Sequence, residues 1–212
     1  MHSRSFAIAV ATSFALVGSD VALARDSWAI PTEAAVEARV ALRPTRAGKG
    51  ASGVARVTST KNKANQDVLT FEITTRGVAP GKHALNAHEN GGDFDFTSCD
   101  DDARCVGRSY NPSSRPHHGP LALKKFGASA CHFVGDGCVL NRHIGDLGNI
   151  VVGEGETSTW TFTDAYTTLK PGAENSLVGR SLVIRAGEDD FETEQDDGNA
   201  GPIILYGAIE VK

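Results

Sequence analysis

Apolar and polar residues alternate along several short stretches of the chain. Between Val36 and Leu42 every second residue is apolar and the residues between them are mostly charged. From Leu69 to Thr74 the apolar residues again occupy every second position. This period of two is typical of β-strands that bury one face. Further strands are predicted at 54–59, 83–88, 150–152, 158–162, 182–185 and 203–211.

No long stretch of the chain follows the 3.6-residue period of an amphipathic helix. The strands are joined mostly by short polar or Gly/Pro-rich turns, such as the one at 77–81. Together these features predict an all-β domain, either a sandwich or a flattened barrel.

Two connections are much longer than the others, Glu89–Asn149 and Gly187–Gly201. Long loops in compact domains are usually functional. All four cysteines lie in the first loop, and an even number in an exported protein predicts disulfides. Three pairings are possible. We favour the local one, Cys99 with Cys105 and Cys131 with Cys138, over crossed pairings or free thiols.

The N-terminus has the features of a secretory signal peptide. Arg4 precedes an apolar run at 6–17, and Ala22-Leu23-Ala24 is a small-residue cleavage site. The run is too short to span a bilayer. We therefore expect export after cleavage near Ala24, a mobile arm at 25–35 and one domain at 36–212.

The overall charge narrows the range of partners. The formal net charge is −5, and no basic cluster interrupts the chain. This argues against nucleic acid or an anionic membrane surface as a partner. A protein or a small molecule remains as the candidate partner. The charge does not predict the oligomeric state.

Residues of metal-ligand type lie in the first long loop. His117, His143 and Asp146 occupy segments rich in Gly and Pro. Imidazole and carboxylate donors suit zinc, which usually takes a tetrahedral set. The alternative is a polar loop whose histidines are only solvated.

Four segments in order resemble the motifs of the copper/zinc superoxide dismutase family, over roughly Val36 to Lys212. The resemblance implies the family's Greek-key fold, a flattened barrel of about eight antiparallel strands, and a copper and a zinc site. The segments are G-K-H-A-L-N-A-H-E at 81–89, S-Y-N-P-S-S-R-P-H-H-G-P at 109–120, H-I-G-D-L-G-N at 143–149, and G-N-A-G at 198–201 followed by Y-G at 206–207.

At the positions that the resemblance implies for copper, the chain has Asn86, His88, Ser109 and Arg185. Only His88 is an imidazole, and an arginine is not a metal ligand. His83 cannot replace Asn86, because it points to the opposite face of the strand; we expect a structural histidine there. Copper is therefore not expected, unless His118 or His132 reaches in from the long loop.

At the positions implied for zinc, His117, His143 and Asp146 are kept and Ser109 replaces the fourth ligand. Water or His118 could complete the set, and an open zinc position can activate water. The resemblance also implies that Asp189 orients the ligands, although it could instead be a solvated carboxylate.

Two other family features are replaced. Ile203 stands where the resemblance implies an arginine that attracts the anionic substrate, and the 187–201 loop is strongly acidic. An acidic rim slows the approach of an anion. Tyr206 stands where the family has a cysteine that ties the long loop to the last strand.

These patterns lead to three functional hypotheses. The first is a zinc-stabilised, non-catalytic protein with a binding or structural role. The second is a superoxide dismutase that uses non-standard copper ligands, and the third is a metal-free interaction module. We also expect Arg185 to fill the copper position and to hydrogen-bond to Asn86, His88 and Ser109.

Overall fold

The computed structural model describes residues 35–63, 65–91, 99–114, 142–193 and 198–212, and the backbone of 131–134 and 137–140. Contacts along the chain divide it into two units, Met1–Glu33 and Ala34–Lys212. All described residues belong to the second unit. The signal peptide and nearly all of the mobile arm therefore lie outside the described residues and stay predictions.

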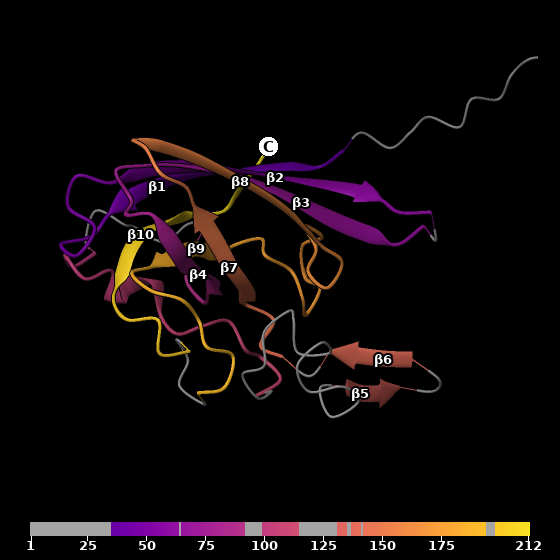
Figure 1. Ribbon diagram of the computed structural model, residues 1–212. Helices are drawn as coiled ribbons and strands as arrows, with labels where there is room; N and C mark the ends of the chain where they lie inside the picture. The colour runs from indigo at the N-terminus through magenta and orange to yellow at the C-terminus, as the bar shows by residue number, and fades with distance from the viewer. Residues whose placement is uncertain are drawn as a thin grey trace, which may run out of the picture. The chain divides into compact units, whose positions relative to one another are not determined.

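The second unit is built around one antiparallel sheet of nine strands. Its order is β7-β4-β9-β10-β1-β2-β3-β8, and β11 pairs with β1 (Figure 1). A separate hairpin consists of β5 and β6. The strands are β1 (Glu37–Pro44), β2 (Ser52–Lys61), β3 (Asp67–Arg76), β4 (Gly81–His88), β5 (Cys131–Val134), β6 (Gly137–Leu140), β7 (Asp146–Val152), β8 (Thr157–Asp164), β9 (Ser181–Arg185), β10 (Ile203–Ala208) and β11 (Glu210–Val211).

The sheet curls into a nearly closed barrel around an apolar core. On β3, Leu69, Phe71 and Ile73 point inward and are fully buried, while Glu72 between them is exposed. The Phe71 ring stacks on that of Phe162 with centroids 4.7 Å apart. The predicted all-β fold with about eight antiparallel strands is confirmed. No helix in the described ranges is long and apolar enough to cross a membrane.

Three local features differ from the sequence-based expectation. β7 begins at Asp146, earlier than predicted, because the chain pairs with β4 as soon as it leaves the H-x-G-D segment. The last predicted strand is interrupted at Ile209, whose amide donates to the carbonyl of Arg180. The β5–β6 hairpin inside the first long loop was not predicted, although Gly135-Asp136-Gly137 between two apolar runs is typical of a hairpin turn.

Candidate metal site

A ring of three backbone hydrogen bonds holds together the three segments that carry the candidate ligands. The amide of Ala87 donates to the carbonyl of Gly145, Gly145 donates to Tyr110, and Tyr110 donates to Ala87. The three N–O distances are 2.7, 2.8 and 2.9 Å. His88, Ser109 and Asp146 each adjoin one member of this ring. The ring therefore fixes the relative positions of segments that are far apart in sequence.

Gly145 is needed for this close approach. A Cβ atom at this position would lie 2.2 Å from the carbonyl oxygen of Ala87 and 2.8 Å from the amide nitrogen of Tyr110. Both neighbours are backbone atoms that cannot move aside without breaking the ring. The glycine of the H-x-G-D segment thus has a packing role that is independent of any metal.

Strand pairing gathers the predicted copper-position residues on one face of the sheet. Ser109 and Ser181 lie on either side of His88, in a β-bridge and in the β4–β9 ladder respectively. One row further along β4, Asn86 lies between Asp146 and Val183. Directly opposed residues point to the same face, so His88 and Asn86 share it with these neighbours.

His88 has a defined orientation in this face. Its Nδ1 lies 2.9 Å from the carbonyl oxygen of Gly107, and the residue is buried. A carbonyl can only accept, so Nδ1 carries the hydrogen, and in the neutral imidazole Nε2 is then the nitrogen with the lone pair. A carbonyl behind an imidazole is the usual arrangement behind a histidine metal ligand.

The neighbours of His88 are polar but poorly satisfied. Asn86, Ser109 and Ser181 are buried, and in the described structure neither side-chain atom of Asn86 and neither serine hydroxyl has a hydrogen-bond partner. An unsatisfied buried polar group costs about 1–3 kcal/mol. The approach of Ser181 to His88 was not predicted from the sequence, because it depends on the β4–β9 register.

One of the contacts of Arg185 differs from the prediction, and whether its side chain fills the copper position stays a prediction. It lies on β9 opposite Ile203 and is almost fully buried, and its Nη1 donates to the carbonyl of Gly201 at 2.9 Å. The predicted hydrogen bonds to Asn86 and Ser109 are wrong, since those side chains have no partner among the described residues. The face of a strand residue follows from the sequence, but the direction of a long side chain does not.

The zinc-side residues lie at the start of β7. His143 and Asp146 are buried and are joined by a turn in which the Asp146 amide donates to the His143 carbonyl. Asp146 Oδ1 accepts the Gly148 amide at 3.0 Å, which orients the carboxylate. An imidazole and an oriented carboxylate in one turn suit zinc chemically. No group of three or more His, Cys, Asp or Glu side chains gathers within the described residues, and neither His117 nor His118 belongs to them.

The residues at the copper positions suit copper less well than His143 and Asp146 suit zinc. Its described side chains supply one imidazole, one amide and two hydroxyls, whereas copper favours several imidazole or sulfur donors. The side chain of His132 lies outside the described residues, so its predicted approach stays an alternative.

A buried ion pair that no local sequence pattern predicts anchors the segment just before His143. Arg142 is completely buried, and its Nη2 donates to Asp164 Oδ1 on β8 at 2.6 Å. Its guanidinium also lies 4.8 Å from the centroid of the Tyr166 ring. Breaking such a pair would leave an uncompensated buried charge.

The second long loop is fixed to β7 by a reciprocal amide contact. The Asn149 side chain donates to the carbonyl of Asp189 and accepts the Asp189 amide, at 2.9 and 2.8 Å. Asp189 is buried, and its predicted role in orienting metal ligands stays a prediction.

His83 is the structural histidine that we predicted, with its two ring nitrogens 2.9 Å from the carbonyls of Arg185 and Ala79.

A disulfide-bonded turn covers the same face of the sheet. Cys99 is bonded to Cys105, which confirms this part of the local pairing. The side chains of Cys131 and Cys138 lie outside the described residues, and their pairing stays a prediction. Tyr206 is buried in an apolar cluster against which both Cys99 and Cys105 pack. The disulfide-bonded turn therefore packs against Tyr206 on the last strand.

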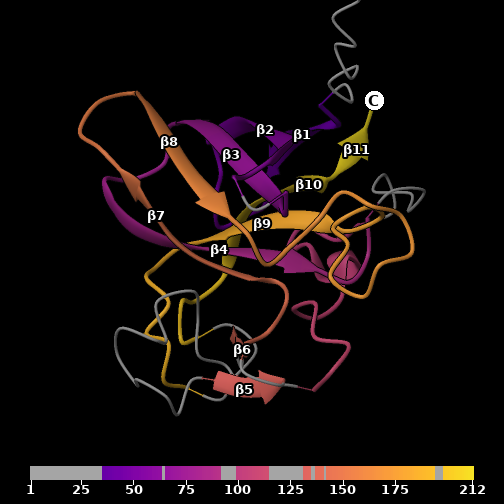
Figure 2. The same ribbon diagram turned by 90° about the vertical axis from the view of Figure 1, so that its right-hand side faces the viewer.

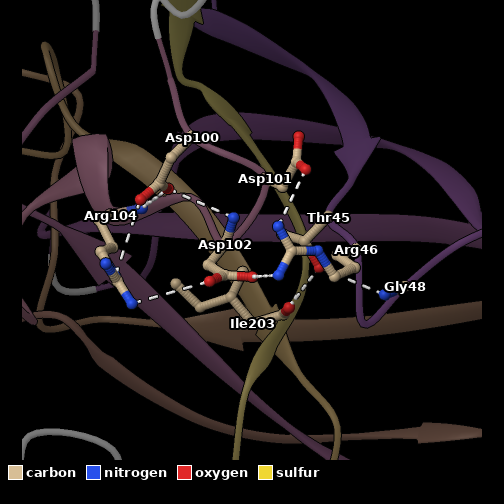
Figure 3. Close-up of polar contacts among 8 residues, drawn as sticks. All are labelled: Thr45, Arg46, Gly48, Asp100, Asp101, Asp102, Arg104 and Ile203. Atoms are coloured by element: carbon tan, nitrogen blue, oxygen red, sulfur yellow. Dashed lines mark hydrogen bonds and ion pairs between the residues drawn. The ribbon is translucent and has the colours of Figure 1, made fainter.

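Charged groups hold the outer side of this turn to the β1–β2 connection (Figure 3). Arg46 donates to Asp101 Oδ2 at 3.0 Å and lies 3.9 Å from Asp102. The hydrogen bond that Arg46 donates to Asp101, followed by the charge of Asp102, raises the pKa of the Arg46 guanidinium. Asp100 Oδ1 accepts the amides of Asp102 and Arg104, which closes the turn from within.

Comparisons with known proteins agree with this architecture. The family model for copper/zinc superoxide dismutase (SODC) matches residues 51–209. The chain is also similar to "Superoxide dismutase [Cu-Zn] 2" from Brassica juncea, with 33% identity over 145 residues that cover 66% of this chain and 79% of the relative. The match spans most of the barrel and both metal-side segments. The chain therefore belongs to the copper/zinc superoxide dismutase family.

Proposed function

We propose that this member of the copper/zinc superoxide dismutase family does not dismute superoxide and acts as an exported, zinc-stabilised protein with a binding or structural role. The observation that carries the proposal is the composition of the face around His88. There Asn86, Ser109 and Arg185 stand at three of the four copper positions, so His88 is the only imidazole among them.

The chemistry of the reaction supports this reading. Dismutation needs a metal that gains and loses one electron in turn, and zinc does not change its oxidation state. Neutral amide and hydroxyl oxygens are poor donors for copper. A buried arginine close to the same face would in addition repel a metal cation.

The zinc side supports the stabilising role. His143 and Asp146 are held in place by the backbone ring and by the Gly148 amide. With His117 they would form three ligands, and water, Ser109 or His118 could supply the fourth. Zinc bound there would join the H-x-G-D turn to the first long loop, so its binding energy would add to folding stability.

Export is supported by two features of the chain. The N-terminal 24 residues have the pattern of a cleavable signal peptide. The Cys99–Cys105 disulfide suits an oxidising compartment, where such bonds persist.

The second candidate is dismutation through non-standard copper ligands. It is favoured by membership of the family and by the orientation of His88, because with Nδ1 on the Gly107 carbonyl its Nε2 would be the nitrogen to bind a metal. His118 or His132 would have to supply further imidazoles. The third candidate, a metal-free module, shares the same barrel and differs from the first only in metal content.

The test is to restore the copper donors. Asn86→His, Ser109→His and Arg185→His, combined in one variant, should create a copper site with a visible absorption band that the wild-type protein lacks. A matched variant with Asn86→Gln, Ser109→Thr and Arg185→Lys should stay colourless with copper. Metal analysis of wild-type protein purified from its native compartment should find zinc without copper.

The contrary result is equally clear. Wild-type protein that contains copper and dismutes superoxide at a rate abolished by His88→Ala would establish the second candidate. Wild-type protein with neither metal, and a melting temperature unaffected by a chelator, would establish the third.

A further inference from the structure

An apolar cavity opens between β7 and β8, and part of its lining, Leu147 to Asn149, directly follows Asp146 on the zinc side. Its volume is about 390 Å³. The side chains that form its apolar walls are Leu147, Val151, Trp160, Phe162 and Phe191. Cavities of about 300–1,000 Å³ with predominantly apolar walls are the usual sites of small-molecule binding.

The cavity arises because the barrel is not closed at this point. β7 and β8 are the two ends of the sheet order and form no ladder with each other. They lie close together at the loop that joins them and separate away from it (Figures 1 and 2). Through this gap the inward-facing Trp160 and Phe162 remain partly exposed, whereas Ile73 and Phe71, their partners on β3, are fully buried.

The second long loop contributes a further wall. Phe191 has a φ of 58°, a left-handed conformation that an aromatic residue rarely adopts. Its amide donates to Asp189 Oδ1 at 2.8 Å, which holds the loop in this conformation. The result is that a third aromatic side chain lines the cavity beside Trp160 and Phe162.

The charged groups at the cavity are neutralised in pairs. Lys82 binds Glu188 with an N–O distance of 2.6 Å. Asp164, the other charged residue of the lining, binds the buried Arg142 at 2.6 Å. No formal charge among the described lining residues is left for a charged ligand to balance, so the cavity favours an uncharged one.

We propose that this cavity is a binding site for a small, flat, uncharged aromatic molecule that inserts between the edges of β7 and β8. Aromatic side chains favour such a ligand because rings pack against one another in offset or edge-to-face contacts. The inference rests on the gap in the barrel, the aromatic walls and the paired charges. It does not depend on which metal the protein holds.

The experiment uses the full mature chain and the neutral probe N-phenyl-1-naphthylamine, whose fluorescence rises in apolar surroundings. The expected result is saturable binding with one site per chain. In a Trp28→Phe background, Trp160 is the only remaining tryptophan, and its emission should be quenched in parallel with probe binding.

Two substitutions and one matched control locate the site. Val151→Glu places a charge at the rim and should weaken probe binding at least tenfold. Val54→Glu makes the same change at another exposed valine, on β2, and should leave binding unchanged. Phe191→Gly removes one wall while relieving its left-handed backbone, and should weaken binding without lowering the melting temperature.

Three outcomes would overturn the proposal. One is equal binding by the Val151→Glu and Val54→Glu variants, and another is binding with no quenching of Trp160. The third is probe binding that disappears as the protein dimerises with rising concentration, with Val151→Glu abolishing the dimer. That result would make the gap a contact with a second copy of the chain.

Discussion

The two sides of the candidate metal face carry different side chains and share one backbone frame. On the side of β4 and β9, the candidate copper positions hold an amide, a hydroxyl and a guanidinium beside one imidazole. On the side of β7, His143 and Asp146 keep ligand side chains in a tight turn. Both sides are positioned by the same ring of Ala87, Tyr110 and Gly145. The comparison shows that one backbone frame positions two different sets of side chains.

The largest expected effect comes from breaking the shared frame. Gly145→Ala would place a methyl group 2.2 Å from the carbonyl oxygen of Ala87, so the ring cannot form unchanged. We expect a loss of more than about 3 kcal/mol in the free energy of unfolding, measured by denaturant titration. Gly153→Ala, which meets only the Ser158 hydroxyl at 3.8 Å, should change it by less than about 0.5 kcal/mol. Equal effects would show that the ring is not what unites the two sides.

The next effect should be confined to the zinc side. Free zinc at about a hundred times its dissociation constant would stabilise the protein by about 2.7 kcal/mol. A chelator should therefore lower the melting temperature in a calorimetric scan, and His143→Ala should remove most of that sensitivity. His83→Ala removes a histidine that binds only backbone carbonyls. It should destabilise the protein while leaving the response to the chelator intact.

On the copper side a substitution should change the stability less than the two changes above, and it should raise the stability instead of lowering it. Asn86 is completely buried and its side-chain atoms have no partner among the described residues. Asn86→Leu should therefore be neutral or stabilise the fold by about 1 kcal/mol in urea unfolding. Asp146→Asn, on the other side, should destabilise the zinc-loaded protein. If Asn86→Leu were strongly destabilising, a bound ion or water would have to satisfy that amide, and the contrast between the two sides would fail.

The smallest expected change in stability comes from Glu37 on β1, which serves as a reference because it lies in neither the copper-position nor the zinc-side segments. Hydrogen bonds from Arg56 and then Arg39 lower the pKa of the partly exposed Glu37 carboxyl. A lowered folded-state pKa means that the stabilisation is present above the ordinary carboxyl pKa and is lost as the pH falls through the folded-state value. Glu37→Gln should thus cost a little stability at pH 7 and none at strongly acidic pH. The same cost at both pH values would show that the ion pair is not its cause.

The barrel could be predicted from the sequence, because period-two alternation reports which face of a strand is buried. β1 and β3 show this most clearly, with apolar residues inward at every second position. The candidate ligands could be named only through their motifs. Their contacts could not be predicted, since the approach of Ser181 to His88 depends on strand register and the buried Arg142–Asp164 pair joins segments that no local pattern connects.

Arg185 shows where the limit lies. Its face on β9 followed from alternation, but its guanidinium binds the carbonyl of Gly201, a residue at the end of the second long loop. Several rotatable bonds separate a guanidinium from its backbone, and the groups that capture it are set by tertiary packing. A prediction of its hydrogen bonds would have required the position of the loop.

The backbone ring has a consequence for the dynamics of the protein. Each of its three residues donates to one neighbour and accepts from the other. The loss of one segment from the contact therefore removes the acceptor of one remaining residue and the donor of the other. Segments linked in this way open together as one cooperative unit. The amide hydrogens of Ala87, Tyr110 and Gly145 should accordingly exchange with deuterium at a common rate, so three distant parts of the chain act as a single kinetic element.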